Sequence, residues 1–336
     1  MKLYKIVFIN SMVMGTMIAI SSYSWLSMWM GLEINLLSII PLFSNSKNIY
    51  STESAMKYFI TQAMASMIML MAVMLMMMNE EFIDPRMNFW FITMMNTALL
   101  IKMGAAPFHF WFPEVMEGLS WNNSFILLTW QKIAPMILFM NNKINITFTS
   151  SIIVISLLTS TISGLNQISL RKILAFSSIN HIAWMLSSMM ISASMWMIYF
   201  LIYSLINFNI VAMFKSTNSF FINQVNNFIN HNKLMKMSFM VSLLSLGGLP
   251  PFVGFMPKWL VINWLSENNL FMLTFVMIIM TLIMLFIYIR IMMVSMIINL
   301  NEPKTVKITI KNQITVMMNM LSIPLIILCT LTPSFL

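Results

Sequence analysis

Long apolar segments separated by short polar ones fill almost the whole chain. A helix needs about 20 apolar residues to cross the hydrocarbon core of a bilayer. With apolar length as the signal, and proline, glycine and charge as the boundaries, the sequence predicts roughly eleven membrane-spanning helices. These cover residues 3–21, 24–43, 55–78, 88–109, 121–141, 149–169, 173–191, 195–214, 237–265, 270–296 and 313–333. The expected fold class is an all-α polytopic membrane protein with a single integral membrane domain, residues 1–336.

Composition supports a membrane protein and excludes several other classes. Of the 336 residues, 60% are hydrophobic and only 8% are charged, whereas a soluble domain carries about 25% charged residues. The net charge of +9 comes from lysines and arginines that stand singly or in pairs between apolar segments. That pattern is not typical of a nucleic-acid-binding surface. The single cysteine, Cys329, excludes a disulfide and any cysteine-held iron–sulfur cluster or zinc site within the chain.

The positive residues also predict the orientation of the chain. Lysine and arginine gather in loops on the cytoplasm-like side of a membrane. With eleven spans as above, most of them fall on the side of the N-terminus, and only Arg86 and Lys143 fall in loops on the other side. Methionine occurs 42 times, a bias that looks like that of an AT-rich animal mitochondrial genome. We therefore expect a multi-pass protein of the mitochondrial inner membrane, with its N-terminus in the matrix and its C-terminus in the intermembrane space.

Two segments interrupt the helical pattern in the same way. Residues 104–113 and 247–257 each contain glycine, a Pro-Phe pair and then a second proline six residues after the first. Freed backbone groups at membrane depth are tolerated only where protein or a watery cavity satisfies them, and paired interruptions are typical of transporters built from repeats. We expect repeat halves near 1–145 and 146–297, two broken helices and a further C-terminal helix at 313–333. Chance similarity between two Pro-Phe-rich loops is the alternative.

Four ionisable residues lie inside the predicted apolar segments. Glu33 and Lys132 are central in their spans, Lys102 lies just before the first interruption, and Lys258 lies at the second. A charge at the centre of a membrane helix costs about 3 kcal/mol, so such residues are functional candidates by default. Burial and a nearby carboxylate act in opposite directions on the proton affinity of a lysine, so lysines in this setting can exchange protons near neutral pH. Snorkelling of the lysines and a structural ion pair for Glu33 are the alternatives.

Histidines and two further carboxylates are additional candidates. His181 lies within a predicted span and can pass protons because imidazole titrates near neutral pH, although such a histidine is equally often a packing residue. His109 lies beside the first interruption and His231 in a polar loop, so they do not form the facing pair that a b-type haem needs. We interpret Glu114 and Glu117 as solvated residues at a helix end.

Four sequence motifs resemble those of one known family. They are WMGLEIN at residues 29–35, KMGAAPFHFW at 102–111, TWQKIAP at 129–135, and LGGLPPF followed by PKW between residues 246 and 259. On these motifs, and over nearly its whole length, the chain resembles subunit 2 of the mitochondrial NADH dehydrogenases of respiratory complex I, in their insect form. That family is antiporter-like and related to the Mrp cation/proton antiporters.

The resemblance implies a role for the chain. It would be a core membrane-arm subunit of proton-translocating NADH:ubiquinone oxidoreductase, with antiporter-like inverted repeats and a central polar axis. No redox cofactor is expected in this chain, because FMN, iron–sulfur clusters and ubiquinone would belong to other subunits. The expected partners are the other membrane-arm and accessory subunits and phospholipids including cardiolipin, with no nucleic acid.

The resemblance also implies a site. Glu33, Lys102, Lys132 and Lys258 match the axis residues of the family, and relatives place a lysine or histidine near His181. As a hypothesis, Glu33 pairs with Lys102, and a charge change from the neighbouring subunit loosens this pair and drives a proton towards Lys132. Lys258 or His181 then passes it outward.

Two alternatives to a proton-pumping subunit remain open from the sequence. One is a free-standing cation/proton antiporter, which co-purification with flavin and iron–sulfur subunits would exclude. The other is a structural spacer of the membrane arm, whose polar residues only hold helices together. Sensitivity of pumping to Lys102 and Lys132 would exclude the spacer.

Overall fold

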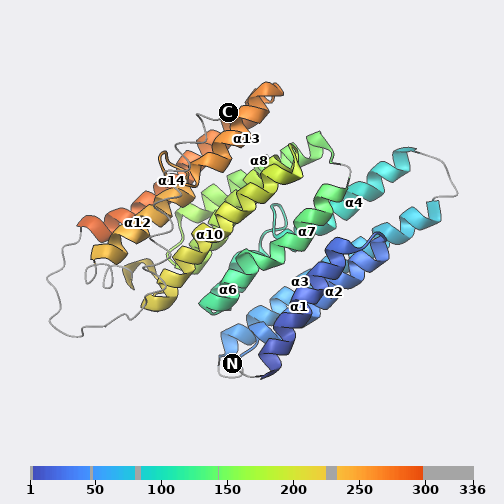
Figure 1. The fold of residues 1–336 in the computed structure, drawn as a ribbon, viewed down its shortest axis with the longest axis horizontal. Helices are drawn as coiled ribbons and strands as arrows, with labels where there is room; N and C mark the ends of the chain where they lie inside the picture. Colours follow the sequence, from blue (N-terminus) through green and yellow to red (C-terminus); the bar gives the residue numbers. More distant parts are fainter. Residues whose placement is uncertain (1–2, 46–47, 80–84, 143, 225–232, 298–336) are drawn as a thin grey trace. The chain divides into compact units, whose positions relative to one another are not determined.

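The computed structural model describes most of the chain as helices joined by short loops (Figure 1). Within the described residues there are thirteen helices, and the β-structure there is one isolated antiparallel bridge between Ser169 and Phe221. The predicted helix 313–333, with Cys329, lies outside the described part, as does His231. The described residues are 3–45, 48–79, 85–142, 144–224 and 233–297.

The chain divides into two compact units, Met1–Phe148 and Thr149–Leu336. Among the described residues, six helices are each long and apolar enough to cross a membrane. Many of their large apolar side chains are exposed, including Met64, Met67 and Leu282. An apolar outer surface of this kind suits lipid, so the all-helical membrane class that the sequence predicts is confirmed.

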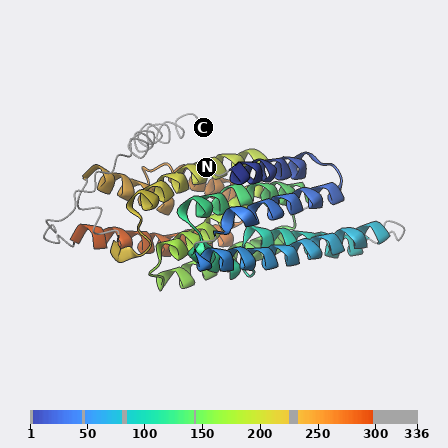
Figure 2. The ribbon, with the colours of Figure 1, turned by 90° about the horizontal axis from the view of Figure 1, so that it is seen from below.

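The first unit is built from seven helices and the start of an eighth. In chain order they are α1 (Leu3–Ser21), α2 (Trp25–Phe43), α3 (Ile49–Asn79), α4 (Pro85–Met103), α5 (Trp111–Gly118), α6 (Trp121–Leu128), α7 (Trp130–Asn141) and α8 (Ile146–Leu165). Helix α3 packs against α2, α4 and α5, and α7 packs against α4. Figures 1 and 2 show α3 and α4 running side by side. These contacts bring the helices that carry Glu33, Lys102 and Lys132 into one bundle.

Small residues let α1 and α2 approach closely. A Cβ atom added to Gly31 would lie 2.5 Å from the backbone nitrogen of Ala19, and one added to Gly15 would lie 2.8 Å from that of Asn35. Helix pairs in membranes pack tightly through such small residues, because lipid supplies little hydrophobic driving force between them. The packing fixes α2 against α1, and Asn35 on α2 is buried.

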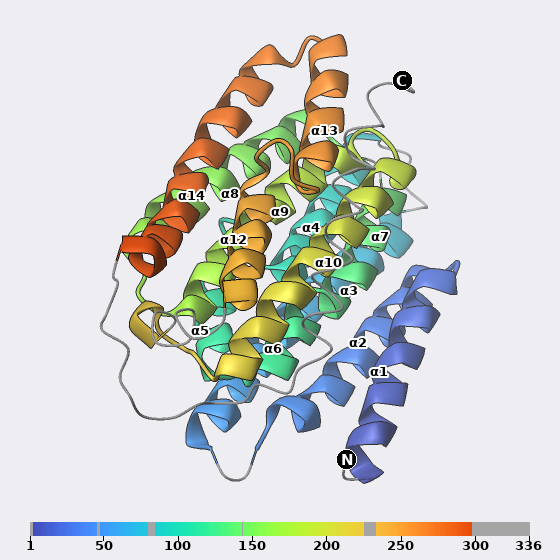
Figure 3. The same cartoon turned by 60° about the vertical axis from the view of Figure 1, so that its left-hand side comes forward.

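The second unit surrounds a buried helix. Helix α9 (Leu170–Met189) is buried on all sides from Ile173 onwards, so its serines, Asn180 and His181 lie in the core. It contacts α10, α13 and α14, and Figure 3 shows the arrangement of these helices. The other helices of this unit are α10 (Ala193–Thr217), α12 (Lys233–Gly247), α13 (Phe255–Glu267) and α14 (Phe271–Ile297), together with most of α8.

Three predicted spans end early or are divided in the structure. The span predicted at 88–109 ends as helix α4 at Met103, and the one at 237–265 is divided into α12 and α13 by the second interruption. The span at 121–141 is also divided, into α6 and α7, at Thr129. This third interruption was not predicted. At Thr129 the backbone leaves the helical conformation, with φ −116° and ψ −72°. Pro135, inside α7, has no N–H to donate to the carbonyl of Gln131.

Candidate functional site

The first helix interruption is a compact turn that ends α4. Gly104 has φ +77°, a backbone conformation that glycine adopts readily because it lacks a Cβ atom. The amides of Gly104 and Ala105 both donate to the carbonyl of Leu100, at 3.0 and 3.1 Å. The Ala106–Pro107 peptide is cis, and α5 begins four residues later at Trp111. The turn satisfies carbonyls that the end of α4 would otherwise leave without partners.

The second interruption repeats this geometry in the other unit. Gly248 has φ +73° and the peptide before Pro251 is cis. The amides of Gly248 and Leu249 donate to the carbonyl of Leu244, at 3.0 and 3.3 Å. Glycine corresponds to glycine and proline to proline in one register, and the two interruptions share a backbone conformation. In that register, however, Lys102 corresponds to Leu246.

Lys102 lies in the last turn of α4 and is 7% exposed. It lines a small cavity of about 10 Å³. The carboxylate of Glu33 on α2 interacts with it electrostatically, although within the described part of the chain no ion pair of 4.0 Å or less joins them. Oε1 of Glu33 is buried and has no hydrogen-bond partner among the described residues. Glu33 and Lys102, which the sequence predicts to be a pair, therefore interact within the first unit without a direct ion pair.

Lys132 lies immediately after the unpredicted interruption between α6 and α7. Its side chain is 1% exposed, and its Nζ lies 5.3 Å from the centroid of the Phe112 ring. The hydroxyl of Thr129 donates to the carbonyl of Phe125 at 2.8 Å, at the end of α6. Snorkelling to a membrane surface does not fit a side chain this deeply buried.

A chain of neutral polar side chains joins the helices around Lys102. The hydroxyl of Tyr58 on α3 donates to Oε1 of Gln131 on α7 at 3.1 Å, and Nε2 of Gln131 donates to Oδ1 of Asn35 on α2 at 3.0 Å. Sequence reasoning did not select these residues. Asn35 and Gln131 do stand within the motifs that contain Glu33 and Lys132, but only the folded structure brings Tyr58 to them.

Lys258 is held by the broken helix of the second unit. Its ammonium donates to the carbonyls of Gly247 at 3.0 Å and Leu246 at 3.3 Å, and lies 5.7 Å from the centroid of the Trp184 ring. These carbonyls end α12, where the helix dipole favours a positive charge. A Cβ atom on Gly248 would lie 2.8 Å from the lysine Nζ. Lys258 therefore caps α12, which is a structural task separate from any proton exchange.

His181 belongs to a buried polar cluster in the second unit. Its Nδ1 lies 3.0 Å from the hydroxyl of Tyr199, and its ring centroid lies 5.0 Å from that of Tyr203. Tyr203 in turn faces Ser178 and Asn207. The histidine is 4% exposed, so it is neither a surface residue nor surrounded only by apolar side chains.

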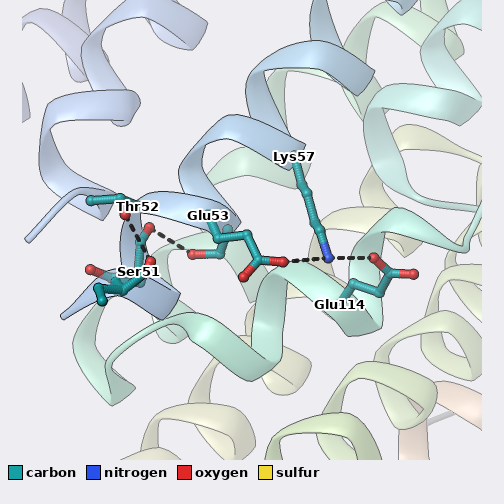
Figure 4. Close-up of polar contacts among 7 residues, drawn as sticks. Ser51, Thr52, Glu53, Lys57 and Glu114 are labelled. Carbon is teal, nitrogen blue, oxygen red and sulfur yellow. Dashed lines mark hydrogen bonds and ion pairs between the residues drawn. The ribbon is translucent and has the colours of Figure 1, made fainter.

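The carboxylate of Glu114 takes part in an ion pair at the surface of the first unit. Lys57 Nζ lies 3.0 Å from Glu53 on its own helix and 3.0 Å from Glu114 on α5 (Figure 4). The side chain of Lys57 is 42% exposed and both carboxylate side chains are 56% exposed. Exposed pairs contribute about 0–1 kcal/mol. This cluster joins α3 to α5 and stands apart from the buried charges.

A substitution at Gly254 tests how closely α12 and α13 pack at the second interruption. A Cβ atom there would lie 1.7 Å from the carbonyl oxygen of Ser245, so Gly254→Ala should push the start of α13 away from the end of α12. We expect the protein to lose about 3 kcal/mol or more of stability, measured as thermal unfolding and as the amount of folded chain in membranes. Gly164→Ala is the matched control, because its nearest contact is the flexible end of Ile287 at 3.1 Å. Equal stability of the two variants would contradict this packing.

The ionisable residues inside the helix bundles form two groups, each within one unit. The first contains the buried Lys102 and Lys132 with the half-buried Glu33, and the second contains the buried Lys258 and His181. In the described ranges no three histidine, cysteine or carboxylate side chains are close enough together to hold a metal ion. Protonatable groups in an apolar setting, beside interrupted helices, can bind and release protons.

Comparisons with known proteins show which family the chain belongs to. Residues 22–284 match the family model described as NADH:quinone oxidoreductase/Mrp antiporter, TM. NADH-ubiquinone oxidoreductase chain 2 of Anopheles gambiae is 53% identical over 84% of this chain and 83% of its own length. The protein of the same name from Locusta migratoria is 45% identical over 95% and 93%.

A solved structure shows the same fold. A chain of respiratory complex I from Thermus thermophilus, determined with bound aureothin, superposes with a TM-score of 0.87 at 19% identity. The match covers 98% of this chain and 78% of the other. The family model and the sequence relatives show that the chain belongs to the NADH:quinone oxidoreductase/Mrp antiporter family of transmembrane subunits, within the NADH-ubiquinone oxidoreductase chain 2 group.

Proposed function

We propose that this chain relays protons across the mitochondrial inner membrane through Glu33, Lys102 and Lys132. The chain is a membrane-arm subunit of proton-translocating NADH:ubiquinone oxidoreductase, a role supported by insect relatives at 45–53% identity. Electron transfer takes place in other subunits, which carry FMN, iron–sulfur clusters and ubiquinone. What this chain contributes is a set of buried groups whose charge changes as protons move.

The observation that carries the proposal is the burial of Lys102 and Lys132 in one unit, each beside a helix interruption, with the half-buried Glu33 acting on Lys102. Lys102 is 7% exposed and Lys132 is 1% exposed, and a buried oxygen of Glu33 has no hydrogen-bond donor in the described structure. Groups held only to stabilise a fold are normally paired and hydrogen-bonded. An incompletely paired carboxylate and ammonium can instead change partner when the local field changes. A charge change in the neighbouring subunit would release the proton of Lys102 towards Lys132.

In the second unit, Lys258 and His181 serve the outward part of the relay. Lys258 is bonded to the carbonyls that end α12, and His181 shares a hydrogen bond with Tyr199. The proposal also includes eleven spans, inverted repeat halves, an N-terminus in the matrix and a C-terminus in the intermembrane space. They rest on the apolar lengths, the matching interruptions and the charge of the loops. Phospholipids, including cardiolipin, would cover the exposed apolar helices.

The interactions at the site are strong enough to supply the free energy that such a step requires. Moving one charge against about 150 mV requires roughly 3.5 kcal/mol, from about 2.3 kcal/mol per 100 mV. Breaking an interaction between a carboxylate and a buried lysine ammonium changes the affinity of the lysine for its proton by a factor of about 100 to 1,000. This change corresponds to about 3–4 kcal/mol. One change of partner at Lys102 is therefore comparable with the work of moving one proton.

Glu33→Gln tests the first step of the relay. We expect the complex to assemble and its proton pumping to fall about tenfold, because the neutral amide no longer interacts with Lys102 as an anion. Pumping and ubiquinone-dependent NADH oxidation are measured together in vesicles that contain the whole complex. Glu53→Gln is the control, since this carboxylate is exposed and paired only at the surface. Normal pumping by an assembled Glu33→Gln complex would favour the structural-spacer alternative.

A further inference from the structure

Methionine forms the exposed side of α3 over more than half of the helix. From residue 61 to residue 78, every exposed side chain is a methionine, and each has between 50% and 74% of its surface exposed. This set, called here the methionine stripe, consists of Met64, Met67, Met71, Met74, Met77 and Met78. Spacings of three or four residues place most of them along one side of the helix. The stripe extends about 21 Å, at 1.5 Å per residue.

The high methionine content of the chain does not by itself produce this stripe. On α14, the exposed residues from 273 to 291 are phenylalanine, isoleucine and leucine, whereas Met277 and Met284 are buried. Methionine therefore lies on the outer side of α3 and on the inner side of α14. Leucine, isoleucine and phenylalanine suit contact with lipid by their apolar character. What methionine adds on α3 is a polarizable sulfur that can be oxidised.

The stripe lies away from the core of the first unit. Tyr58, Gln62 and Met69 are buried, and at 100° per residue they lie on the side of α3 opposite to most of the stripe. Helix α3 is long and apolar enough to cross a membrane, so the stripe faces acyl chains. A sulfoxide at a buried methionine would disrupt the packing of the core. On the stripe, the added oxygen leaves the core contacts of α3 in place.

We propose that the methionine stripe is a modification site, at which lipid hydroperoxides of the surrounding bilayer transfer oxygen to the thioethers. In this step the O–O bond of the hydroperoxide breaks and an S–O bond forms. The sulfur gives up two electrons and becomes a sulfoxide. The hydroperoxide is reduced to a lipid alcohol, and its proton passes to the oxygen that stays on the lipid. Methionine sulfoxide reductases return the sulfoxide to methionine.

Mass spectrometry of the whole complex tests the site residue by residue. The complex is placed in phosphatidylcholine vesicles whose linoleoyl chains carry hydroperoxide groups, and the sulfoxide at each methionine of α3 is measured over time. We expect Met67 and Met71 to be oxidised at least about tenfold faster than Met69, the matched buried control on the same helix. Equal rates at the three residues would overturn the proposal.

A second oxidant distinguishes a lipid source from an aqueous one. In vesicles of unoxidised phosphatidylcholine, the water-soluble reagent chloramine T should leave Met67 and Met71 largely unmodified, because the hydrocarbon core excludes it. Oxidation of these two residues by the aqueous reagent alone would overturn the lipid source. No oxidation under either condition would show that another subunit covers the stripe, and would also overturn the proposal.

Replacement of the six stripe methionines by leucine tests the stoichiometry. Leucine is apolar and similar in volume, so this variant should assemble and pump protons as the wild type does. Its consumption of hydroperoxide per complex should fall by the number of stripe sulfoxides that form in the wild type. Met69→Leu is the control and should leave the consumption unchanged. Equal consumption by the stripe variant and the wild type would contradict the inference.

The inference goes beyond the proton relay and fails separately from it. The experiments with hydroperoxide measure sulfoxide and lipid alcohol, neither of which depends on pumping. If Glu33→Gln pumps normally, the relay is wrong and the oxidation of the stripe is unaffected. If the stripe is not oxidised while Glu33→Gln lowers pumping, the relay stands and the modification site is wrong.

Discussion

Lys132→Met should leave the complex assembled and lower its coupled proton pumping at least about tenfold. The side chain is almost fully buried beside the Phe112 ring, and methionine fills nearly the same space without a charge. Because a buried charge costs energy to keep, its removal should not destabilise the helix bundle. The measurement is the rate of ubiquinone-dependent NADH oxidation and of proton uptake in sealed vesicles.

The Lys132→Arg variant distinguishes a lysine that exchanges protons from one needed only for its positive charge. A guanidinium keeps the positive charge but does not release its proton at accessible pH. Lys132→Arg should therefore pump as poorly as Lys132→Met if the lysine exchanges protons, whereas a residue needed only for its charge would tolerate arginine. Lys215→Met, at an exposed position near the end of α10, should change neither assembly nor pumping. Full activity of the arginine variant would show that Lys132 is not a relay residue.

Lys258→Met should destabilise the second helix interruption by about 3 kcal/mol. The substitution removes the donor to the carbonyls of Leu246 and Gly247, and a buried carbonyl left without a partner costs about 1–3 kcal/mol. Faster hydrogen exchange of the amides between residues 244 and 254, together with a lower unfolding temperature of the complex, would report this loss.

Lys258→Arg separates the capping task from the proton-exchange task. Arginine retains a charge and several donors for the carbonyls, so stability and slow hydrogen exchange should largely return. Pumping should stay low, because the guanidinium cannot pass a proton on. A methionine variant as stable as the wild type would contradict the cap, and an arginine variant with normal pumping would limit Lys258 to capping.

The helix positions could be predicted wherever apolar length was the deciding signal. The first two helices begin and end within one residue of the predicted bounds. Helix α3 begins at Ile49, earlier than predicted, because its first turns are polar and apolar length does not detect them; they include the pair between Glu53 and Lys57. The division at Thr129 was missed because its neighbours are apolar, and the proline that accompanies it lies six residues further on.

The site could be predicted only in part. The burial of Lys102, Lys132 and Lys258 followed from their apolar neighbours, since a charge within such a segment must enter the core or reach a membrane surface. Their partners depend on tertiary contacts. Tyr58 lies far from Gln131 in sequence, and Lys258 reaches the end of α12 because Gly254 allows the two helices to approach.

The repeat gave a useful but incomplete guide. The matching prolines and glycines correctly marked two interruptions with the same backbone geometry. The two lysines occupy different positions of the matching segments. Lys102 belongs to the helix before its interruption and lines a cavity, whereas Lys258 belongs to the helix after it and binds carbonyls.

The number of protons pumped per electron pair tests the central claim most directly. It is counted in vesicles during NADH oxidation by ubiquinone, with fully assembled complexes that carry either Lys132→Met or the control Lys215→Met. The relay predicts a lower ratio for Lys132→Met, or a proportional loss of turnover if coupling is strict, and wild-type values for the control. An unchanged ratio and an unchanged rate with Lys132→Met would contradict a proton path through this chain.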